Sequence, residues 1–152
     1  MNLLSFARCV GIFNRQTQAY ITAALSSMNI SFSEYILLTN LYNNEGINQE
    51  DASSMLFIDK AAVARSIKSL EEKGFISREV TLEDRRSKKL FLTDMAQKNK
   101  EYFYSILERW EIYTTEGMDT EMKDQVFKGL QIMAEKSASA NFSEVSQYER
   151  RK

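Results

Sequence analysis

The stretch of sequence that decides the fold is DKAAVARSIKSLEEKGFISREVTLEDRRSKKLFLT, residues 59–93. Its first half has helical spacing: Asp59 is a favourable N-cap, apolar residues recur every three or four positions, and Gly74 suits the position after a helix C-terminus. The period then changes, because β-branched and aromatic residues flank the polar turn LEDRRS at 82–87. The stretch therefore predicts a helix followed directly by a β-hairpin.

Three more helices are predicted before this stretch. Apolar side chains spaced by threes and fours indicate one long amphipathic helix over residues 2–27. Ser31 lies three residues before Glu34, a capping-box pattern that begins a second helix reaching about Asn43. Asn48 is placed to cap a short third helix.

Two helices are predicted after the hairpin. Thr93 or Asp94 caps a long helix that reaches about Thr115, and Asp119 caps the next one. From residue 137 to 152 the composition is polar and small, which indicates a frayed tail. The predicted fold is mostly α (α+β), with four helices, a hairpin and two helices; residues 31–93 form a winged helix-turn-helix.

The composition argues against an enzyme or a metalloprotein. The 152 residues contain no His and one Cys, so the chain has no His-based proton relay, His ligand or cysteine zinc site. No Gly-rich phosphate loop is present, and we expect no cofactor. A signal peptide and a run of 18 apolar residues are also missing, so a cytoplasmic protein without a membrane partner is expected.

The helix-and-hairpin pattern suits double-stranded DNA. A helix fits the major groove, where base edges differ, and an arginine-bearing hairpin tip suits the narrow minor groove. The net charge of −1 is low for a DNA-binding protein, but the basic residues cluster locally at 85–89. Lys60 and Arg65 are candidates for hydrogen bonds to bases or phosphates, and the small Ala61, Ala62 and Ala64 let the helix approach closely.

Over residues 3–135 the sequence resembles the MarR family of multiple antibiotic resistance regulators. The matching segments are LEEKGFI at 70–76, DRRSKKLFLT at 84–93 and INQEDASSMLFIDKAAVARSI at 47–67. The resemblance implies a homodimeric, ligand-responsive transcriptional regulator, most simply a repressor, that binds a pseudo-palindromic operator. It also implies that residues 1–30 and 94–136 form dimerisation helices around the DNA-binding domain at 31–93.

The resemblance also assigns roles to individual residues. Asp84 would brace the hairpin, or wing, and Arg86 would enter the minor groove. The full set of candidate DNA-binding residues is Lys60, Ala61, Ala62, Ala64, Arg65, Lys68, Asp84, Arg85, Arg86 and Lys88.

An effector pocket is the second site that the resemblance implies. Relatives often bind aromatic or anionic effectors between the dimer helices and the winged domain, and an Arg among aromatic residues can hold a carboxylate. The candidate pocket residues are Phe13, Arg15, Tyr20, Tyr35 and Tyr42. Aromatic residues at helical spacing are more often core residues, so both interpretations stand.

Two alternative functions remain open at this stage. Cys9 suggests the redox-sensing branch of the family, but that branch's cysteine would align near Ala7, and its activating tyrosine is replaced by Phe32. We therefore predict Cys9 to be a buried packing residue. The other alternative is a winged-helix module for protein interaction, which would not need cations at both groove-facing elements.

Overall fold

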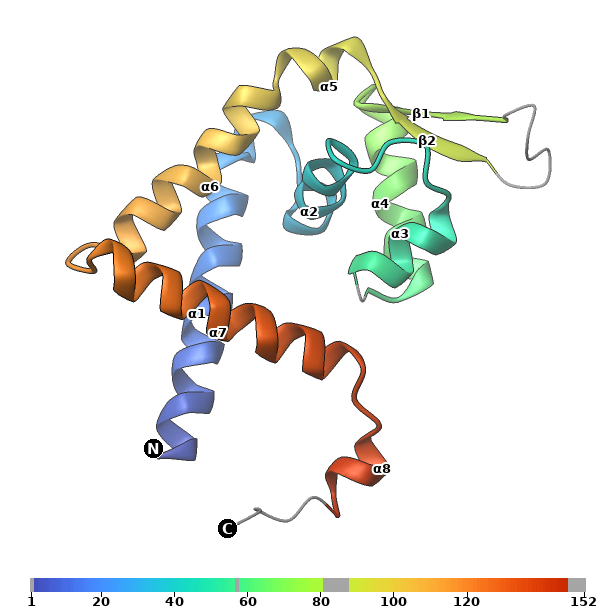
Figure 1. The fold of residues 1–152 in the computed structure, drawn as a ribbon. Coiled ribbons are helices and arrows are strands. Elements are labelled where there is room, and N and C mark those ends of the chain that lie inside the picture. The colour runs from blue at the N-terminus through green and yellow to red at the C-terminus, as the bar shows by residue number, and fades with distance from the viewer. Residues whose placement is uncertain (1, 57, 81–87, 148–152) are drawn as a thin grey trace. The chain divides into compact units, whose positions relative to one another are not determined.

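The computed structural model describes residues 2–56, 58–80 and 88–147 of the chain, and helices predominate in it (Figure 1). Its elements are α1 (Leu3–Ala24), the 3₁₀ helix η1 (Ser26–Met28), α2 (Phe32–Leu41), α3 (Gln49–Leu56), α4 (Lys60–Glu72), β1 (Ile76–Glu79), β2 (Lys89–Leu92), α5 (Asp94–Lys98), α6 (Lys100–Thr114), α7 (Thr120–Ala138) and α8 (Phe142–Val145). The predicted fold class, a mostly α protein with one β-hairpin, is confirmed.

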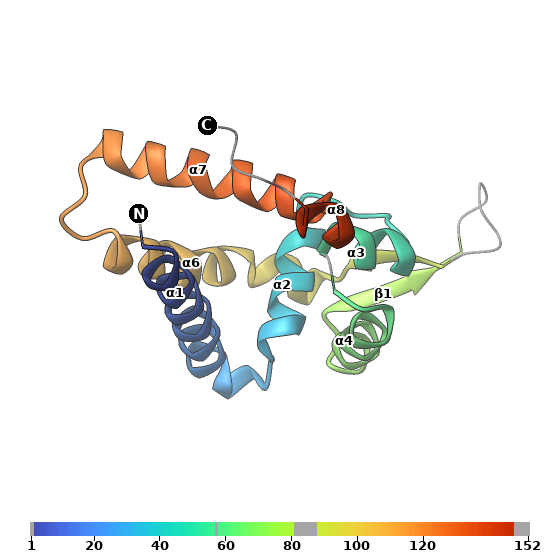
Figure 2. The ribbon, with the colours of Figure 1, turned by 90° about the horizontal axis from the view of Figure 1, so that it is seen from below.

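The chain divides into two compact units, Met1–Tyr113 and Thr114–Lys152. The first unit runs from α1 into α6 and contains the hairpin, whereas the second contains α7 and α8. Within the first unit, α3, α4 and the hairpin lie at one end and α1 lies at the other, with α2 between them (Figures 1 and 2).

Side-chain caps begin most of the helices, as their sequence patterns predict. Ser31 and Glu34 form a reciprocal capping box at α2: the Glu34 amide donates to Ser31 Oγ at 3.3 Å, and the Ser31 amide donates to Glu34 Oε2 at 2.6 Å. The simpler cap, in which a side-chain oxygen accepts from the amide three residues on, occurs at Asn48, Asp59, Thr93 and Asp119.

The two strands form an antiparallel hairpin in which Ile76 pairs with Leu92 and Glu79 pairs with Lys89. The segment before α3 lies along the other edge of β2. There the Leu90 amide donates to the carbonyl of Ile47 at 2.8 Å. This pairing joins the start of α3 to the base of the hairpin.

Tyrosine hydroxyls connect α2 to the helices that follow the hairpin. Tyr35 is fully buried, and its hydroxyl donates to the carbonyl of Phe103 in α6 at 2.7 Å. Tyr42 donates in the same way to the carbonyl of Ala96 in α5 at 2.6 Å. Burial raises the pKa of Tyr35, and it raises that of Tyr42 to about 12, so both phenols are protonated donors at neutral pH.

The structure differs from the sequence prediction at two places in the C-terminal half. The helix expected from Thr93 to about Thr115 is divided into α5 and α6 at Asn99. The Asn99 side chain donates to the carbonyl of Met95 at 2.8 Å and so competes with the backbone hydrogen bonds of a continuous helix. In the segment expected to be a frayed tail, α7 continues to Ala138 and the short helix α8 follows.

Among the described residues, no helix combines the length and the apolar character needed to cross a membrane.

Candidate nucleic-acid interface

Helix α4 has one buried face and one exposed face. Asp59 caps it by accepting a 2.9 Å hydrogen bond from the Ala62 amide, and Gly74, with φ of 77°, ends it. Val63, Ile67 and Leu70 are buried in the core of the first unit. On the other side, the predicted DNA-binding residues Lys60, Ala61, Arg65 and Lys68 are exposed, whereas Ala62 and Ala64 are partly buried.

The cations on this exposed face differ in their partners. Lys60 forms an ion pair with Glu50 of α3, with Nζ and Oε1 2.5 Å apart. Lys68 lies 3.8 Å from Glu72, one helical turn further along α4. Arg65 has no ion pair within the part of the chain that the structure describes. Its guanidinium is therefore available to an external acceptor.

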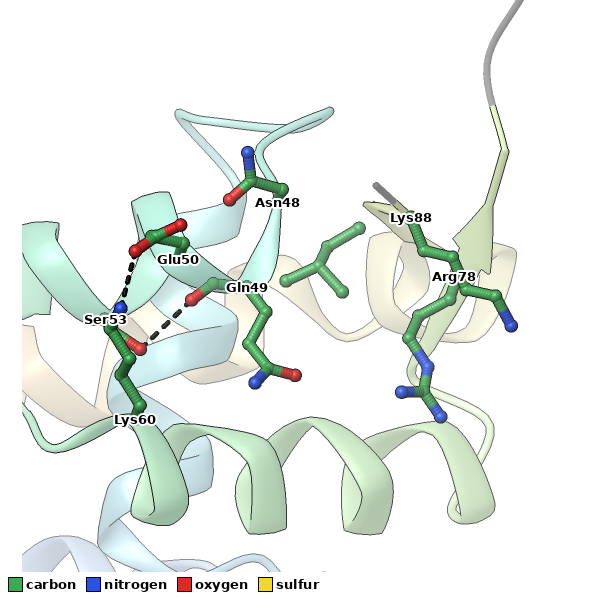
Figure 3. Close-up of a pocket in the computed structure, with 8 residues that line it drawn as sticks. Asn48, Gln49, Glu50, Ser53, Lys60, Arg78 and Lys88 are labelled. Carbon is green, nitrogen blue, oxygen red and sulfur yellow. Dashed lines mark hydrogen bonds and ion pairs between the residues drawn. The ribbon is translucent and has the colours of Figure 1, made fainter. Parts of the chain in front are cut away.

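A polar groove of about 450 Å³ lies beside α4, between α3 and the hairpin (Figure 3). Its lining residues are Asn48, Gln49, Glu50, Ser53, Lys60, Arg78, Lys88 and Leu90. Figure 3 shows Glu50 and Lys60 on one side of the groove and Arg78 and Lys88 on the strand side. The groove thus gathers three cations, from α4, from β1 and from the residue before β2. A phosphate group fits such a surface.

Arg78 was not predicted as a site residue. Its Nε donates to Glu71 Oε2 at 2.9 Å, and its Nη2 forms a second, short hydrogen bond to the same oxygen. These bonds lower the pKa of Glu71, with a further contribution from Lys88. The available signal was position: Arg78 lies in the strand that leads from the predicted recognition helix into the basic turn.

A second, smaller hollow of about 220 Å³ lies between the start of α2 and α4. It is lined by Ser31, Ser33, Glu34, Ala62, Arg65, Ser66 and Ser69. The Ser66 hydroxyl lies 3.3 Å from that of Ser33, within hydrogen-bond distance. Arg65 therefore has hydroxyl groups on one side and open solvent on the other.

A buried ion pair connects the end of α4 to the start of α2. Lys73 Nζ lies 2.8 and 2.9 Å from the two carboxylate oxygens of Glu34, whose side chain is only 5% exposed. Lys73 also donates to the carbonyl of Asn29, a left-handed residue in the turn between α1 and α2. Burial by itself raises the pKa of Glu34, but hydrogen bonds from Lys73, Ser69 and Ser31 outweigh it and lower that pKa overall.

Three of the predicted wing residues, Asp84, Arg85 and Arg86, lie outside the described residues. Lys88 is described; it is exposed and lines the polar groove.

The predicted effector residues fall into two groups. Phe13 and Tyr20 of α1 pack against Trp110 of α6, with ring centroids 6.4 and 4.9 Å apart, respectively. Tyr35 and Tyr42 instead use their hydroxyls to bind backbone carbonyls in the core. Arg15 is exposed and its guanidinium folds back along α1 toward Gly11. Besides burial, Tyr20 and Tyr42 also raise the pKa of Tyr35, so the tyrosines of the two groups are electrostatic neighbours in the single chain.

The prediction that Cys9 is a buried packing residue is wrong for the single chain, in which Cys9 is exposed. The apolar residues on the same part of α1, such as Leu4 and Val10, are exposed as well. The cause is that the N-terminal part of α1 extends away from the core of the first unit. Within the described residues, no group of three or more acidic or cysteine side chains is arranged to hold a metal ion.

The chain is similar to known proteins of one family. The model of the MarR family matches residues 30–88. A crystal structure of a MarR transcriptional regulator from Methanosarcina mazei Go1 is 30% identical; the match covers 86% of this chain and 94% of that chain, with a TM-score of 0.80. The uncharacterized HTH-type transcriptional regulator YybA of Bacillus subtilis (strain 168) is 29% identical over 78% of this chain and 79% of its own length.

One similar structure was solved with nucleic acid. It is a MarR family transcriptional regulator from Listeria monocytogenes complexed with 26mer DNA, 23% identical, with a TM-score of 0.84 over 96% of this chain and 97% of that chain. At this identity the similarity establishes the shared fold.

Proposed function

Because the chain belongs to the MarR family of transcriptional regulators, we propose that it regulates transcription by binding a specific DNA operator as a homodimer. The observation that carries this proposal is the exposed face of α4. It presents Arg65 without an ion pair among the described residues, and small alanines lie beside it. We propose that it has no catalytic role and acts in the cytoplasm.

Helix α4 is the element proposed to enter the major groove. Arg65 is long enough to form two hydrogen bonds to a guanine edge, and Ala61 and Ala64 allow the helix backbone to approach the bases. The groove beside α4 supplies Lys60, Arg78 and Lys88 for the phosphate backbone. Asp84, Arg85 and Arg86 lie outside the described residues, so their proposed wing and minor-groove roles rest on the sequence pattern and the family resemblance.

The proposed dimer rests on apolar side chains that each unit leaves uncovered. On α1, the exposed large apolar residues are Leu3, Leu4, Phe6, Val10, Ile12 and Phe13. None of the described residues of α7 is buried, and its exposed apolar residues are Met122, Val126, Phe127, Leu130, Ile132 and Met133. Helices with so much uncovered apolar surface need a partner, and a second copy of the chain provides two matching sets. We therefore propose that residues 1–30 and 94–136 form the dimerisation region.

We further propose that an aromatic or anionic effector controls DNA binding, most simply by releasing a repressor. The part of the predicted pocket that supports this is the group of Phe13, Tyr20 and Trp110, because Phe13 is 50% exposed beside two stacked rings. Arg15 is exposed on the same helix and offers a carboxylate partner.

The test combines hydrodynamics with DNA binding. Sedimentation equilibrium of the purified chain is expected to show a dimer at micromolar concentration. Fluorescence anisotropy with a labelled duplex is expected to show affinity that falls with salt, the log–log slope being about −0.9 for each phosphate neutralised. A folded protein that binds no duplex at low salt would refute DNA binding and favour the protein-interaction module. A stable folded monomer would refute the dimer.

A further inference from the structure

Most cations around the exposed face of α4 already have a carboxylate partner in the same chain. Lys60 is paired with Glu50 at 2.5 Å, and Lys68 is 3.8 Å from Glu72. Arg78 holds one oxygen of Glu71 with two nitrogen donors. Carboxylates of the same chain therefore neutralise most of the positive charge on the surface that would contact DNA.

Two of these carboxylates occupy the donors that a phosphate needs. Glu50 accepts from Lys60 inside the polar groove, where a phosphate oxygen would otherwise bind (Figure 3). Glu71 accepts from Nε and Nη2 of Arg78, the planar fork with which arginine also binds phosphate. A phosphate and either carboxylate cannot use the same donors at the same time.

The carboxylates of Glu50 and Glu71 are both ionised at neutral pH. Hydrogen bonds from Lys60 lower the pKa of Glu50, and hydrogen bonds from Arg78 lower that of Glu71. Both groups are therefore ionised wherever the protein is expected to work.

We propose that Glu50 and Glu71 act as internal competitors of DNA, lowering the affinity of this interface for duplex of any sequence. Each must release its cation before a phosphate can bind there. Glu72 acts on Lys68 in the same way, but more weakly, because the two groups are further apart. The inference rests on the proposed DNA binding and adds the residues that set its strength.

The competition changes the salt dependence as well as the affinity. A phosphate that binds a free lysine releases its condensed counterion, which gives the usual steep decrease of affinity with salt. When the lysine must first leave a glutamate, that glutamate takes up a cation from solution. This uptake offsets part of the release, so each intact pair makes the slope shallower by less than the roughly 0.9 that one neutralised phosphate contributes.

The experiment measures binding of a random-sequence duplex of about 30 base pairs, which avoids any need to know the operator. Fluorescence anisotropy is recorded over a salt series for the 152-residue chain and for Glu50→Gln and Glu71→Gln. The matched control is Glu144→Gln, which makes the same charge change at an exposed residue of α8, outside the proposed DNA-binding and dimerisation regions. Thermal unfolding followed by circular dichroism verifies that each variant is folded.

We expect Glu50→Gln and Glu71→Gln to bind about two- to fivefold more tightly than Glu144→Gln, a range set by the modest strength of exposed ion pairs. Their log–log slopes are expected to be steeper as well. If the gain arises from releasing Lys60, then Glu50→Gln has no effect in a Lys60→Gln background. This double-variant test separates release of the lysine from a general change in surface charge.

Three results would overturn the inference. The first is that both glutamine variants match Glu144→Gln in affinity and slope while the original protein binds duplex; this leaves the proposed function intact. The second is that Glu50→Gln raises the affinity for duplex as much in the Lys60→Gln background as in the original protein. That result would show that Glu50 acts by direct repulsion of the phosphates. The third is no duplex binding by any form of the protein at low salt, which refutes the proposed function together with the competition.

Discussion

The ion pair between Glu34 and Lys73 allows a quantitative test of how the recognition helix is positioned. Lys73 follows the last turn of α4, and Glu34 lies in the first turn of α2, so the pair fixes one end of α4 against the turn after α1. Replacing Lys73 by Met keeps most of the side-chain volume but leaves the Glu34 carboxylate, 5% exposed, without its cation.

Breaking a fully buried pair in this way typically costs roughly 3–5 kcal/mol. Lys73 is 23% exposed, so water partly replaces the lost interaction. We therefore expect Lys73→Met to lower the free energy of unfolding by about 2 to 3 kcal/mol at pH 7. Glu34→Gln keeps a polar group that can accept hydrogen bonds, and it is expected to cost about 1 to 2 kcal/mol.

The pH dependence follows from the direction of the pKa shift. Because the folded protein lowers the pKa of Glu34 from 4.5, the pair contributes its full stability above that pH and loses it as the pH falls through the folded pKa. The difference in stability between the original protein and Glu34→Gln is therefore expected to be constant near neutrality. It is expected to narrow in acid.

The assay is urea unfolding followed by circular dichroism at a fixed protein concentration, since dimerisation makes stability depend on concentration. The control is Lys60→Met, which removes the lysine of the exposed Glu50 pair and is expected to leave the unfolding midpoint unchanged. The reasoning is refuted if Lys73→Met unfolds at the same urea concentration as the original protein. It is also refuted if the two lysine variants lose equal stability.

Three further predictions concern single residues. Asp59→Ala removes the cap of α4 and is expected to cost about 1 kcal/mol in urea unfolding, with weaker DNA binding; an unchanged midpoint would show that the 2.9 Å cap contributes nothing. Arg65→Ala is expected to cost about 1 to 3 kcal/mol at one base pair of each half-site, whereas Arg86→Ala is expected to weaken binding to most sequences, as measured against a half-site substitution series. Equal loss on every sequence for Arg65→Ala would identify Arg65 as a phosphate contact. Cys9→Ser is expected to leave both DNA binding and its response to peroxide unchanged, and release of DNA by peroxide from the original protein alone would establish a redox role.

Local chemistry explains why much of the fold can be predicted from the sequence. Ser31, Asp59, Thr93 and Asp119 begin helices through hydrogen bonds to amides only three residues away, and Gly74 ends α4 with a positive φ. The period change after Gly74 likewise identifies the hairpin from neighbouring residues alone. Helix caps and changes of period involve only a few neighbouring residues, so they can be recognised in a single sequence.

Features that depend on contacts between different elements cannot be recognised from the sequence alone. The Glu50–Lys60 and Glu71–Arg78 pairs join different elements, so their partners become evident only when α3, α4 and β1 are placed together. The break at Asn99 depends on how its side chain, at 2.8 Å, shares the carbonyl of Met95 with its backbone amide, at 3.3 Å. For the same reason the candidate DNA-binding residues of α4 could be named from the sequence, but the role of Arg78 could not.

Selection of bound sequences from a random pool of duplex DNA by the purified protein tests whether it recognises a specific operator. The account predicts enrichment of an inverted repeat whose half-sites lie about one helical turn apart, because a twofold dimer presents two copies of α4 to one face of the duplex. A guanine at one position of each half-site is expected to disappear from the enriched set when the selection is repeated with Arg65→Ala. A pool that shows no enriched sequence after several rounds, with the protein folded and dimeric, would contradict the account.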